Sequence, residues 1–397
     1  MADYAASART RARRYPRADT ARAVSFVRRL DWIMLAAVGA LVASGLWAID
    51  GITRQDVAGN PDYYVVRQGT FAVVGALGLV GVLLIDPSLY RRYRKAIYGL
   101  IIGMLFVVTV VGSEVRGSTR WIDLGFFQFQ PSEFGKLLLA LFLAGLLAER
   151  GKRITESRTT LLAIGGAVLP MVLVFFQPDI GTALVYGAIL LAALFFAGTR
   201  WRDLAVIAAV AAVVGTFVLW AGPAMGVQVL EDYQRDRLTA FTDPSKNPQG
   251  AAYNINQSIT AVGSGGLDGR GVTGATQTRL DYLPEHETDF VFAALSEQRG
   301  FVGASILLSL YLLLIWRGIR VIATARDAFA ATVAGAIVFG LLFQTFVNIG
   351  MTIGIAPITG IPLPFVSVGG SAMIANLLAI GVLEAIYVRG NAHRRRL

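Results

Sequence analysis

Long apolar stretches, each bounded by charged residues, glycine or proline, recur along almost the whole chain of 397 residues. A helix that crosses the hydrocarbon core of a membrane needs about 20 mostly apolar residues. The pattern therefore predicts an all-α polytopic membrane protein, folded as a single membrane domain over residues 31–388. We expect ten transmembrane helices, at 31–49, 69–85, 96–112, 133–148, 159–176, 180–198, 203–222, 289–316, 328–354 and 370–388.

The composition supports a membrane protein and excludes several kinds of site. Hydrophobic residues make up 55% of the chain and charged residues 16%, against roughly 25% charged in an ordinary soluble domain. There is no cysteine, which excludes disulfides, thiolate metal sites and cysteine nucleophiles. With only His286 and His393 present, a zinc centre built from histidines is not expected.

The distribution of basic residues predicts the orientation in the membrane. The net charge is +10, from 36 Lys and Arg against 26 Asp and Glu, and such basicity can indicate nucleic-acid binding. Here 25 of the basic residues lie in one alternating set of loops and tails, and 9 lie in the other. Because cytoplasmic loops carry the excess of Lys and Arg, both termini are predicted to be cytoplasmic, as an Arg-rich tail (1–30) and a basic tail (389–397). Topology therefore accounts for the charge, and no nucleic-acid partner is expected.

Two external segments break the simple alternation of spans and short loops. The segment 223–288 is far longer than a connector requires, and its aromatic and glycine content favours an ordered, functional part. Residues 355–369 carry no charge, yet three prolines forbid a continuous helix. Apolar backbone of this kind must be buried in protein or line a cavity, so we interpret it as re-entrant, with a plain external turn as the alternative.

A third segment, 117–133, interleaves aromatic residues with charges and is typical of a stretch lying in the outer interface. Trp121 there is equally explained as an ordinary interfacial tryptophan. Pro131, followed by Ser132 and Glu133, predicts the start of a helix. Glu133 and Lys136 share one face of that helix, either as functional groups within a span or as a structural ion pair.

The densest cluster of ionisable residues lies where the long external segment enters the eighth predicted span. Three carboxylates, Glu285, Glu287 and Asp289, surround His286. A carboxylate at the outer membrane boundary is partly desolvated, which raises its pKa and suits it to act as a base. Asp289 is equally explained as a helix N-cap. Glu297 lies about two helical turns further into the span.

Together these segments resemble the SEDS proteins (shape, elongation, division and sporulation), the membrane glycosyltransferases that polymerise bacterial cell-wall glycan from lipid II. The resemblance is closer to the elongation type, RodA, than to the division type, FtsW. The matching residues run from 120 to 371 in the family's order: Arg120-Trp121-Ile122, Gln130-Pro131-Ser132-Glu133, Lys136, Gln177-Pro178-Asp179-Ile180-Gly181-Thr182, the glycine-rich 263–271, Pro284-Glu285, Thr288-Asp289-Phe290, Asn348 to Phe365, Ser367 and Gly369-Gly370-Ser371.

The resemblance implies roles for individual residues. Asp289 matches the family's essential aspartate and is the expected catalytic residue, either as general base or as ligand of a divalent cation, Mg²⁺ or Mn²⁺. The acceptor sugar hydroxyl would attack the donor's anomeric carbon, and undecaprenyl pyrophosphate would leave. Cations should gather near Asp289 to hold the pyrophosphate, with Arg116 and Arg299 as further candidates. The expected substrate-binding residues are Arg120, Trp121, Glu133, Lys136, Arg270, Arg279, Glu297, Ser367 and Ser371.

The resemblance also implies a location and partners. We expect the protein in the bacterial cytoplasmic membrane, acting at its outer face on lipid II and nascent glycan. No serine transpeptidase site is visible, so a class B penicillin-binding protein is expected to supply cross-linking, alongside other membrane proteins of the elongation complex. Two other functional classes stay open: a lipid II flippase, because broken spans and buried ions also describe transporters, and a scaffold without chemistry of its own.

Overall fold

The computed structural model describes residues 27–54, 56–57, 59–115, 118–125, 127–226, 232–242 and 250–394. Most of the Arg-rich N-terminal tail, Arg116 and the last three residues lie outside this range.

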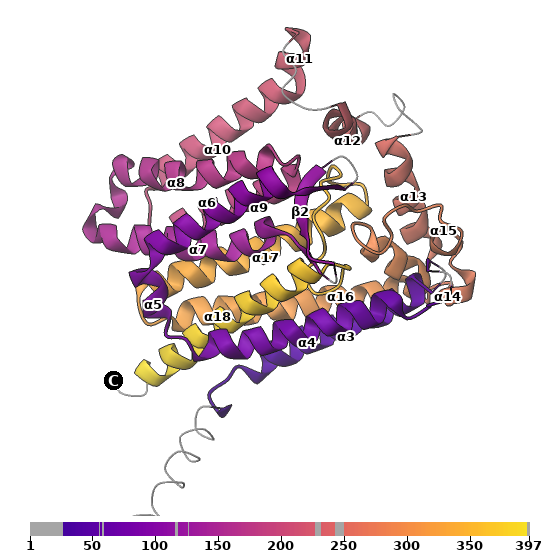
Figure 1. The fold of residues 1–397 in the computed structure, drawn as a ribbon, viewed down its shortest axis with the longest axis horizontal. Coiled ribbons are helices and arrows are strands. Elements are labelled where there is room, and N and C mark those ends of the chain that lie inside the picture. Colours follow the sequence, from indigo (N-terminus) through magenta and orange to yellow (C-terminus); the bar gives the residue numbers. More distant parts are fainter. Residues whose placement is uncertain are drawn as a thin grey trace, which may run out of the picture.

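The described residues form a bundle of long helices that run side by side (Figure 1). Nine of these helices are long and apolar enough to cross a membrane, which confirms the multi-pass helical fold. They are α3 (Trp32–Ile52), α4 (Tyr63–Leu84), α6 (Arg94–Val111), α7 (Pro131–Arg150), α8 (Ser157–Phe175), α9 (Ile180–Ala197), α16 (Val291–Thr324), α17 (Ala328–Thr352) and α18 (Gly370–Arg394).

The seventh predicted span, 203–222, falls on a helix that differs from these nine. The helix α10 (Trp201–Thr216) continues through a π-helical turn (Phe217–Ala221) into α11 (Gly222–Ala224). None of the residues of α10 is buried, and α10 and α11 project away from the bundle (Figure 1). The count of ten spans, like the orientation of the termini, therefore stays a prediction.

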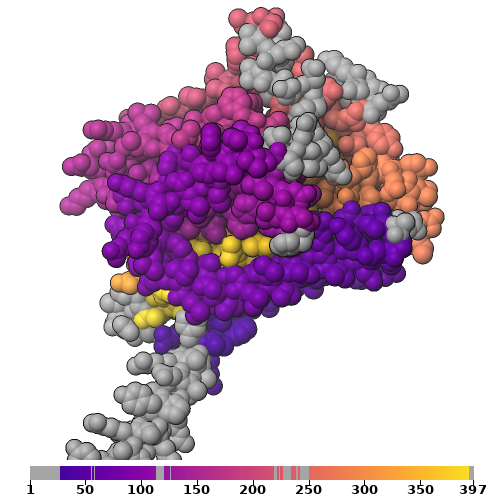
Figure 2. Space-filling model, viewed as in Figure 1, coloured from indigo at the N-terminus to yellow at the C-terminus, as the bar shows by residue number. Residues whose placement is uncertain are grey.

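At the centre of the bundle α18 packs closely along α4. A side chain at Gly75 would lie 2.6 Å from Leu377, and one at Gly381 would lie 2.7 Å from the backbone oxygen of Leu79. Small residues of this kind let two membrane helices approach each other closely. The resulting burial leaves the middle of α18 visible as a narrow yellow band in Figure 2.

The interfacial segment adds a small sheet to the helical fold. Strands β1 (Ser113–Val115), β2 (Ser118–Asp123) and β3 (Gln128–Phe129) pair antiparallel in that order, with Ile122 opposite Phe129. The chain then enters α7 at Pro131, as the sequence predicts. The connection between α4 and α6 is the short helix α5 (Pro87–Arg92), and a 3₁₀ turn (Gly151–Thr155) follows α7.

The described part of the segment 223–288 is largely helical. It contains α12 (Asp232–Thr242), α13 (Ala251–Ser264), α14 (Gly271–Gly274) and α15 (Thr276–Arg279), which lie at the same end of the bundle as β2 (Figure 1). We call this the cavity end. The opposite end, where α3 begins and α18 finishes, is the terminal end.

The glycine-rich stretch before α14 packs against a break in α16. Gly300 has φ 64° and ψ −164°, which interrupts the helix and favours glycine. The amides freed by the break find new acceptors, because Phe301 donates to Gly266 and Val302 to Leu267. A side chain at Gly269 would lie 2.3 Å from the backbone oxygen of Gln298. These glycines therefore permit close backbone contact.

At the terminal end α16 runs eight residues beyond its predicted end at 316, and this extension buries a charge cluster. Arg317 donates from Nε to the Asp31 carboxylate at 2.8 Å, and the Asp31 amide donates to Glu384 at 3.1 Å. All three residues are nearly inaccessible to solvent. Asp31 also caps α3 by accepting from the Met34 amide. We call Asp31, Arg317 and Glu384 the terminal charge cluster.

Candidate functional site

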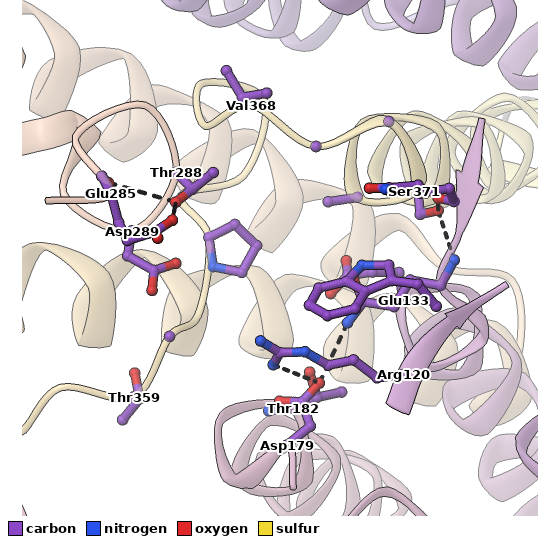
Figure 3. A pocket seen from close by; sticks show the side chains of 18 of the residues that line it. Arg120, Glu133, Asp179, Thr182, Glu285, Thr288, Asp289, Thr359, Val368 and Ser371 are labelled. Atoms are coloured by element: carbon purple, nitrogen blue, oxygen red, sulfur yellow. Dashed lines mark hydrogen bonds and ion pairs between the residues drawn. The ribbon is translucent and has the colours of Figure 1, made fainter. Parts of the chain in front are cut away.

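A cavity of about 510 Å³ opens at the cavity end of the bundle. Its walls come from the start of α4, from β2, from the starts of α7, α9 and α18, from α12, and from two non-helical stretches, 285–289 and 357–362. The proline-containing segment 355–369 is non-helical and contributes to the cavity lining, and its interpretation as re-entrant stays a prediction. Figure 3 shows Asp289 and Glu285 on one side of the cavity and Arg120 with Asp179 on the other.

The backbone around Asp289 is held from several directions. Ser367 donates its hydroxyl to the Thr288 carbonyl at 2.6 Å, and Asn348 donates to the Asp289 carbonyl at 2.9 Å. The Phe290 amide donates to the Glu285 carbonyl. The residue that caps α16 is Phe290, so Asp289 does not serve as the helix N-cap. Its carboxylate instead lines the cavity.

Electrostatics at Asp289 combine burial with charges of both signs. Burial raises the pKa of the Asp289 carboxyl to about 6, and the nearby Glu285 and Asp179 carboxylates act in the same direction. Arg237 and Arg120 oppose this shift. A group with such a pKa is a stronger base than an ordinary carboxylate and is still mostly ionised near neutral pH.

Gly360 leaves room for these groups. Its φ of +70° suits glycine, and a side chain there would lie 3.1 Å from Nη1 of Arg237 and 3.5 Å from Oδ2 of Asp289. The segment 355–369 thus brings a residue without a side chain close to an arginine and a carboxylate that come from different parts of the chain.

On the opposite wall Arg120 lies between an acid and an aromatic ring. Its Nη1 is 3.7 Å from the Asp179 carboxylate, and its guanidinium carbon is 4.4 Å from the Trp121 ring centre. Asp179 caps α9 through the Thr182 amide and also accepts from Gln130. Arg120 and Trp121 both line the cavity.

Glu133 and Lys136 form a buried pair beneath the cavity. Lys136 Nζ lies 2.6 Å from the Glu133 carboxylate and donates to Gln344 at 2.7 Å. Glu133 lines the cavity, whereas Lys136 does not. The ion pair proposed from their spacing is confirmed; substrate binding by either stays a prediction.

The two predicted serines connect elements around the cavity. Ser371 lines it, accepts from the Gln130 amide and donates to the Gln128 carbonyl, which joins α18 to the strand β3. Ser367 accepts from the Leu363 amide in addition to its bond to Thr288, and it is not among the lining residues. These contacts connect elements of the cavity wall, and substrate binding by either serine stays a prediction.

Four other predicted residues lie outside the cavity lining. Glu297 is fully buried, and its carboxylate accepts from the Gln277 and Thr278 amides and from the Thr278 hydroxyl. Arg270 donates to the Ser264 carbonyl. The remaining two are Arg279, exposed at the end of α15, and Arg299, which lies 3.6 Å from the Trp47 ring centre.

Several cavity residues were not singled out as site residues from the sequence. Some come from the start of α4 or from α12, where no local pattern distinguishes them from interfacial residues. The segment Gln177-Pro178-Asp179 was noted in the family pattern without a role. The lining residues with polar or charged side chains that were not among the predicted site residues are Tyr64, Arg67, Gln68, Gln128, Gln130, Asp179, Thr182, Gln234, Arg237, Glu285, Glu287, Thr288 and Thr359.

A divalent cation at Asp289 would need ligands from outside the protein. Among the described residues, Asp289 does not belong to a group of three or more close histidine and carboxylate side chains. Magnesium is commonly held by one or two carboxylates together with substrate phosphates and water. Asp289 fits that arrangement only when a pyrophosphate lies in the cavity.

The fold and the cavity thus define a multi-pass membrane protein with charged side chains lining a cavity at one end of its bundle. A family model described as "cell cycle protein", for FtsW, RodA and SpoVE, matches residues 28–391. The chain belongs to this family, the SEDS proteins indicated by its sequence.

Individual relatives agree with this assignment. The chain is 36% identical over 368 residues to the peptidoglycan glycosyltransferase MrdB of Escherichia coli K12, covering 93% of this chain and 95% of that one. It is 36% identical over 324 residues to the stage V sporulation protein E of Bacillus subtilis, covering 81% and 86%.

Solved structures share the fold. The rod shape determining protein RodA of Thermus thermophilus is 28% identical, with a TM-score of 0.66 over 90% of this chain and 96% of that one. A chain from a peptidoglycan synthase complex that coordinates polymerization and crosslinking is also 28% identical, with a TM-score of 0.76 over 91% and 98%.

Proposed function

We propose that this protein is a peptidoglycan glycosyltransferase that polymerises lipid II at the outer face of the bacterial cytoplasmic membrane, with Asp289 as its catalytic residue. The observation that carries the proposal is the cavity that Asp289 shares with Arg120 and Arg237. It brings together a base of raised pKa and two cations, which a transfer from a pyrophosphate-linked sugar needs.

The reaction follows from these groups. The acceptor sugar hydroxyl attacks the anomeric carbon of the donor, Asp289 takes the hydroxyl proton, and the bond from that carbon to the pyrophosphate oxygen breaks. Arg120 and Arg237 stabilise the negative charge on the departing lipid pyrophosphate. A divalent cation, when bound to Asp289 and the pyrophosphate, would supply further charge neutralisation there.

The helices give this chemistry its location. The non-helical stretches at the cavity end place the site at one end of the apolar bundle, where a lipid-linked sugar has its headgroup while its chain remains in the membrane. The similarity to a RodA structure supports a role in cell elongation. The similarity to a chain of a synthase complex supports a class B penicillin-binding protein as cross-linking partner.

The test is polymer formation from lipid II by the purified protein alone, with an inhibitor of the unrelated bifunctional glycosyltransferases present. Asp289→Asn should abolish the polymer on a gel, and Asp62→Asn, an exposed carboxylate at the start of α4, should not. Undiminished polymer from folded Asp289→Asn would contradict the catalytic assignment. A flippase would instead move lipid II across vesicles without making polymer.

A further inference from the structure

Outside the cavity, three side chains from two external segments come together. Asp56 lies in the loop between α3 and α4, and Asp281 and His286 lie in the turn that leads to Asp289. One ligand atom from each of the three lies within 4.8 Å of the other two, the one such group of three in the described part of the chain. Neither the reaction proposed above nor the cavity uses these atoms.

The histidine ring is oriented as in a metal site. Its Nδ1 is 2.9 Å from the Leu283 carbonyl, and a carbonyl only accepts, so Nδ1 carries the hydrogen. Metal-binding histidines are commonly fixed in this way, with the second ring nitrogen directed at the ion. His286 is 6% exposed, and its Nε2 is buried without a hydrogen-bond partner. The nearest carboxylate oxygen, of Asp56, is 3.5 Å away.

The charges around Nε2 favour a cation. Besides Asp56 and Asp281, the Glu287 carboxylate approaches Nε2 to 3.9 Å. Among the described residues, no lysine or arginine forms an ion pair with Asp56 or Asp281.

We propose that Asp56, Asp281 and His286 bind a divalent transition-metal ion, with Zn²⁺ or Mn²⁺ as the fitting class. One imidazole nitrogen and two carboxylate oxygens are ligands that these ions accept, whereas Mg²⁺ and Ca²⁺ prefer oxygen alone. The exposure of Asp56 and Asp281 leaves room for water to complete the coordination.

Bound there, the ion would join the α3–α4 loop to the turn that holds Asp289. Hydrogen bonds from the segment 355–369 already hold that turn, because the Val368 amide donates to the Glu287 carbonyl and the Ser367 hydroxyl donates to the Thr288 carbonyl. The ion would therefore hold the turn to the α3–α4 loop, in addition to these hydrogen bonds. Its role is structural, and the three ligands are positioning residues.

The test is metal binding, measured without reference to glycan synthesis. The full-length protein, purified with an affinity tag that lacks histidine and freed of metal by a chelator, is titrated with Zn²⁺ or Mn²⁺ alone, and with Mg²⁺ for comparison. We expect one Zn²⁺ or Mn²⁺ per chain and weaker binding of Mg²⁺. His286→Ala and Asp281→Asn should each weaken binding about tenfold or more, and the matched control Asp62→Asn should bind like the wild type.

Two further measurements separate loss of the site from loss of the fold. X-ray absorption of the zinc-loaded protein should show a single imidazole among oxygen ligands. The ion should raise the unfolding temperature of the wild type and of Asp62→Asn, and leave that of Asp281→Asn unchanged. Asp281 is exposed, so this variant should fold. Absence of saturable binding, or unchanged binding in folded Asp281→Asn, would overturn the proposal and leave a His286–Asp56 ion pair only.

Discussion

The cavity and the terminal charge cluster both place acids and arginines in an apolar bundle, yet they differ in what the charges face. At the terminal end Arg317 contacts Asp31 directly, and the side chains of both are almost completely buried. At the cavity end Arg120 and Asp289 lie on opposite walls of a volume of about 510 Å³. Ionisable groups within membrane proteins are often functional. From this contrast we infer that the separated charges of the cavity can accept a ligand between them, whereas the directly paired charges of the terminal charge cluster hold helices together.

The largest expected effect separates activity from stability at the cavity end. Asp289→Asn should reduce polymerisation about 10²- to 10⁴-fold, the usual range for loss of a general base. It should not lower the unfolding temperature at pH 8, because burial disfavours the charged carboxylate that the substitution removes. Polymer yield and thermal unfolding of one preparation test both. A strongly destabilised Asp289→Asn protein would show that the cavity, too, is a structural charge cluster.

At the terminal end we expect a loss of stability without a loss of activity. Arg317→Ala leaves Asp31 and Glu384 buried without their cation, and breaking a buried ion pair costs about 3–5 kcal/mol. The unfolding temperature should fall markedly, while the remaining folded protein should keep its activity. Arg320→Ala, three residues further along and exposed, is the control and should have little effect. A stable but inactive Arg317→Ala protein would contradict the comparison.

Arg237 tests whether the cavity cations act on the substrate and on Asp289 together. Arg237→Gln should lower kcat/KM about 10- to 100-fold, the value of one charge-assisted hydrogen bond. Because Arg237 lowers the pKa of Asp289, its loss should also move the acidic limb of the pH–rate profile to higher pH. Arg235→Gln, an exposed residue of the same helix, is the matched control. An unmoved profile would place Arg237 away from the reacting groups.

The pH dependence of the wild type follows from the raised pKa of Asp289. The base must be ionised, so the rate should fall as the pH drops through about 6, approaching tenfold per pH unit below it. The free energy of unfolding should depend on pH in the opposite direction to the rate. Because the pKa of Asp289 is raised in the folded state, its protonated form stabilises the folded protein at low pH, and this contribution is lost as the pH rises through about 6. Initial rates between pH 5 and 8 test the first, and a limb near the ordinary carboxyl value of 3.8 would contradict it.

The smallest effect on activity is expected at Gly360, where the absence of a side chain leaves space beside Arg237 and Asp289. Gly360→Ala costs about 1–2 kcal/mol for a non-glycine residue in the left-handed region, and its methyl group crowds Arg237 and Asp289. Gly59→Ala has a similar φ of +79° but nothing within 4 Å. Both should lose comparable stability, and only Gly360→Ala should also lose activity per folded molecule. Equal activity in the two variants would show that space at Gly360 is not needed.

The sequence predicts those parts of the molecule that depend on local pattern. Nine of the ten predicted spans fall on long apolar helices, and Pro131 begins α7 because proline suits the first helical turn. The Glu133–Lys136 pair follows from a spacing of three residues. The position of Asp289 in the cavity agrees with the clustering of acids before α16.

Features that depend on distant contacts could not be predicted. Arg237 reaches the cavity from α12, and nothing near it in the sequence indicates that approach to Asp289. The burial of Arg317 required knowing that α16 continues beyond 316 and meets Asp31. The resemblance predicts Glu297 at the substrate, and this role stays a prediction. Its carboxylate accepts from the amides of Gln277 and Thr278 in α15, a contact that depends on the folded chain and has no local signal in the sequence.

The anchoring of the proline-containing segment 355–369 ties the cavity wall to three separate helices. Its carbonyl groups accept hydrogen bonds from Gln68 of α4, which donates to Ser367, from Tyr311 of α16, which donates to Pro364, and from Asn348 of α17, which donates to Ile361. Tyr311 and Asn348 do not themselves line the cavity. A substitution at either of them should therefore alter the wall that faces Asp289 without touching a bound molecule.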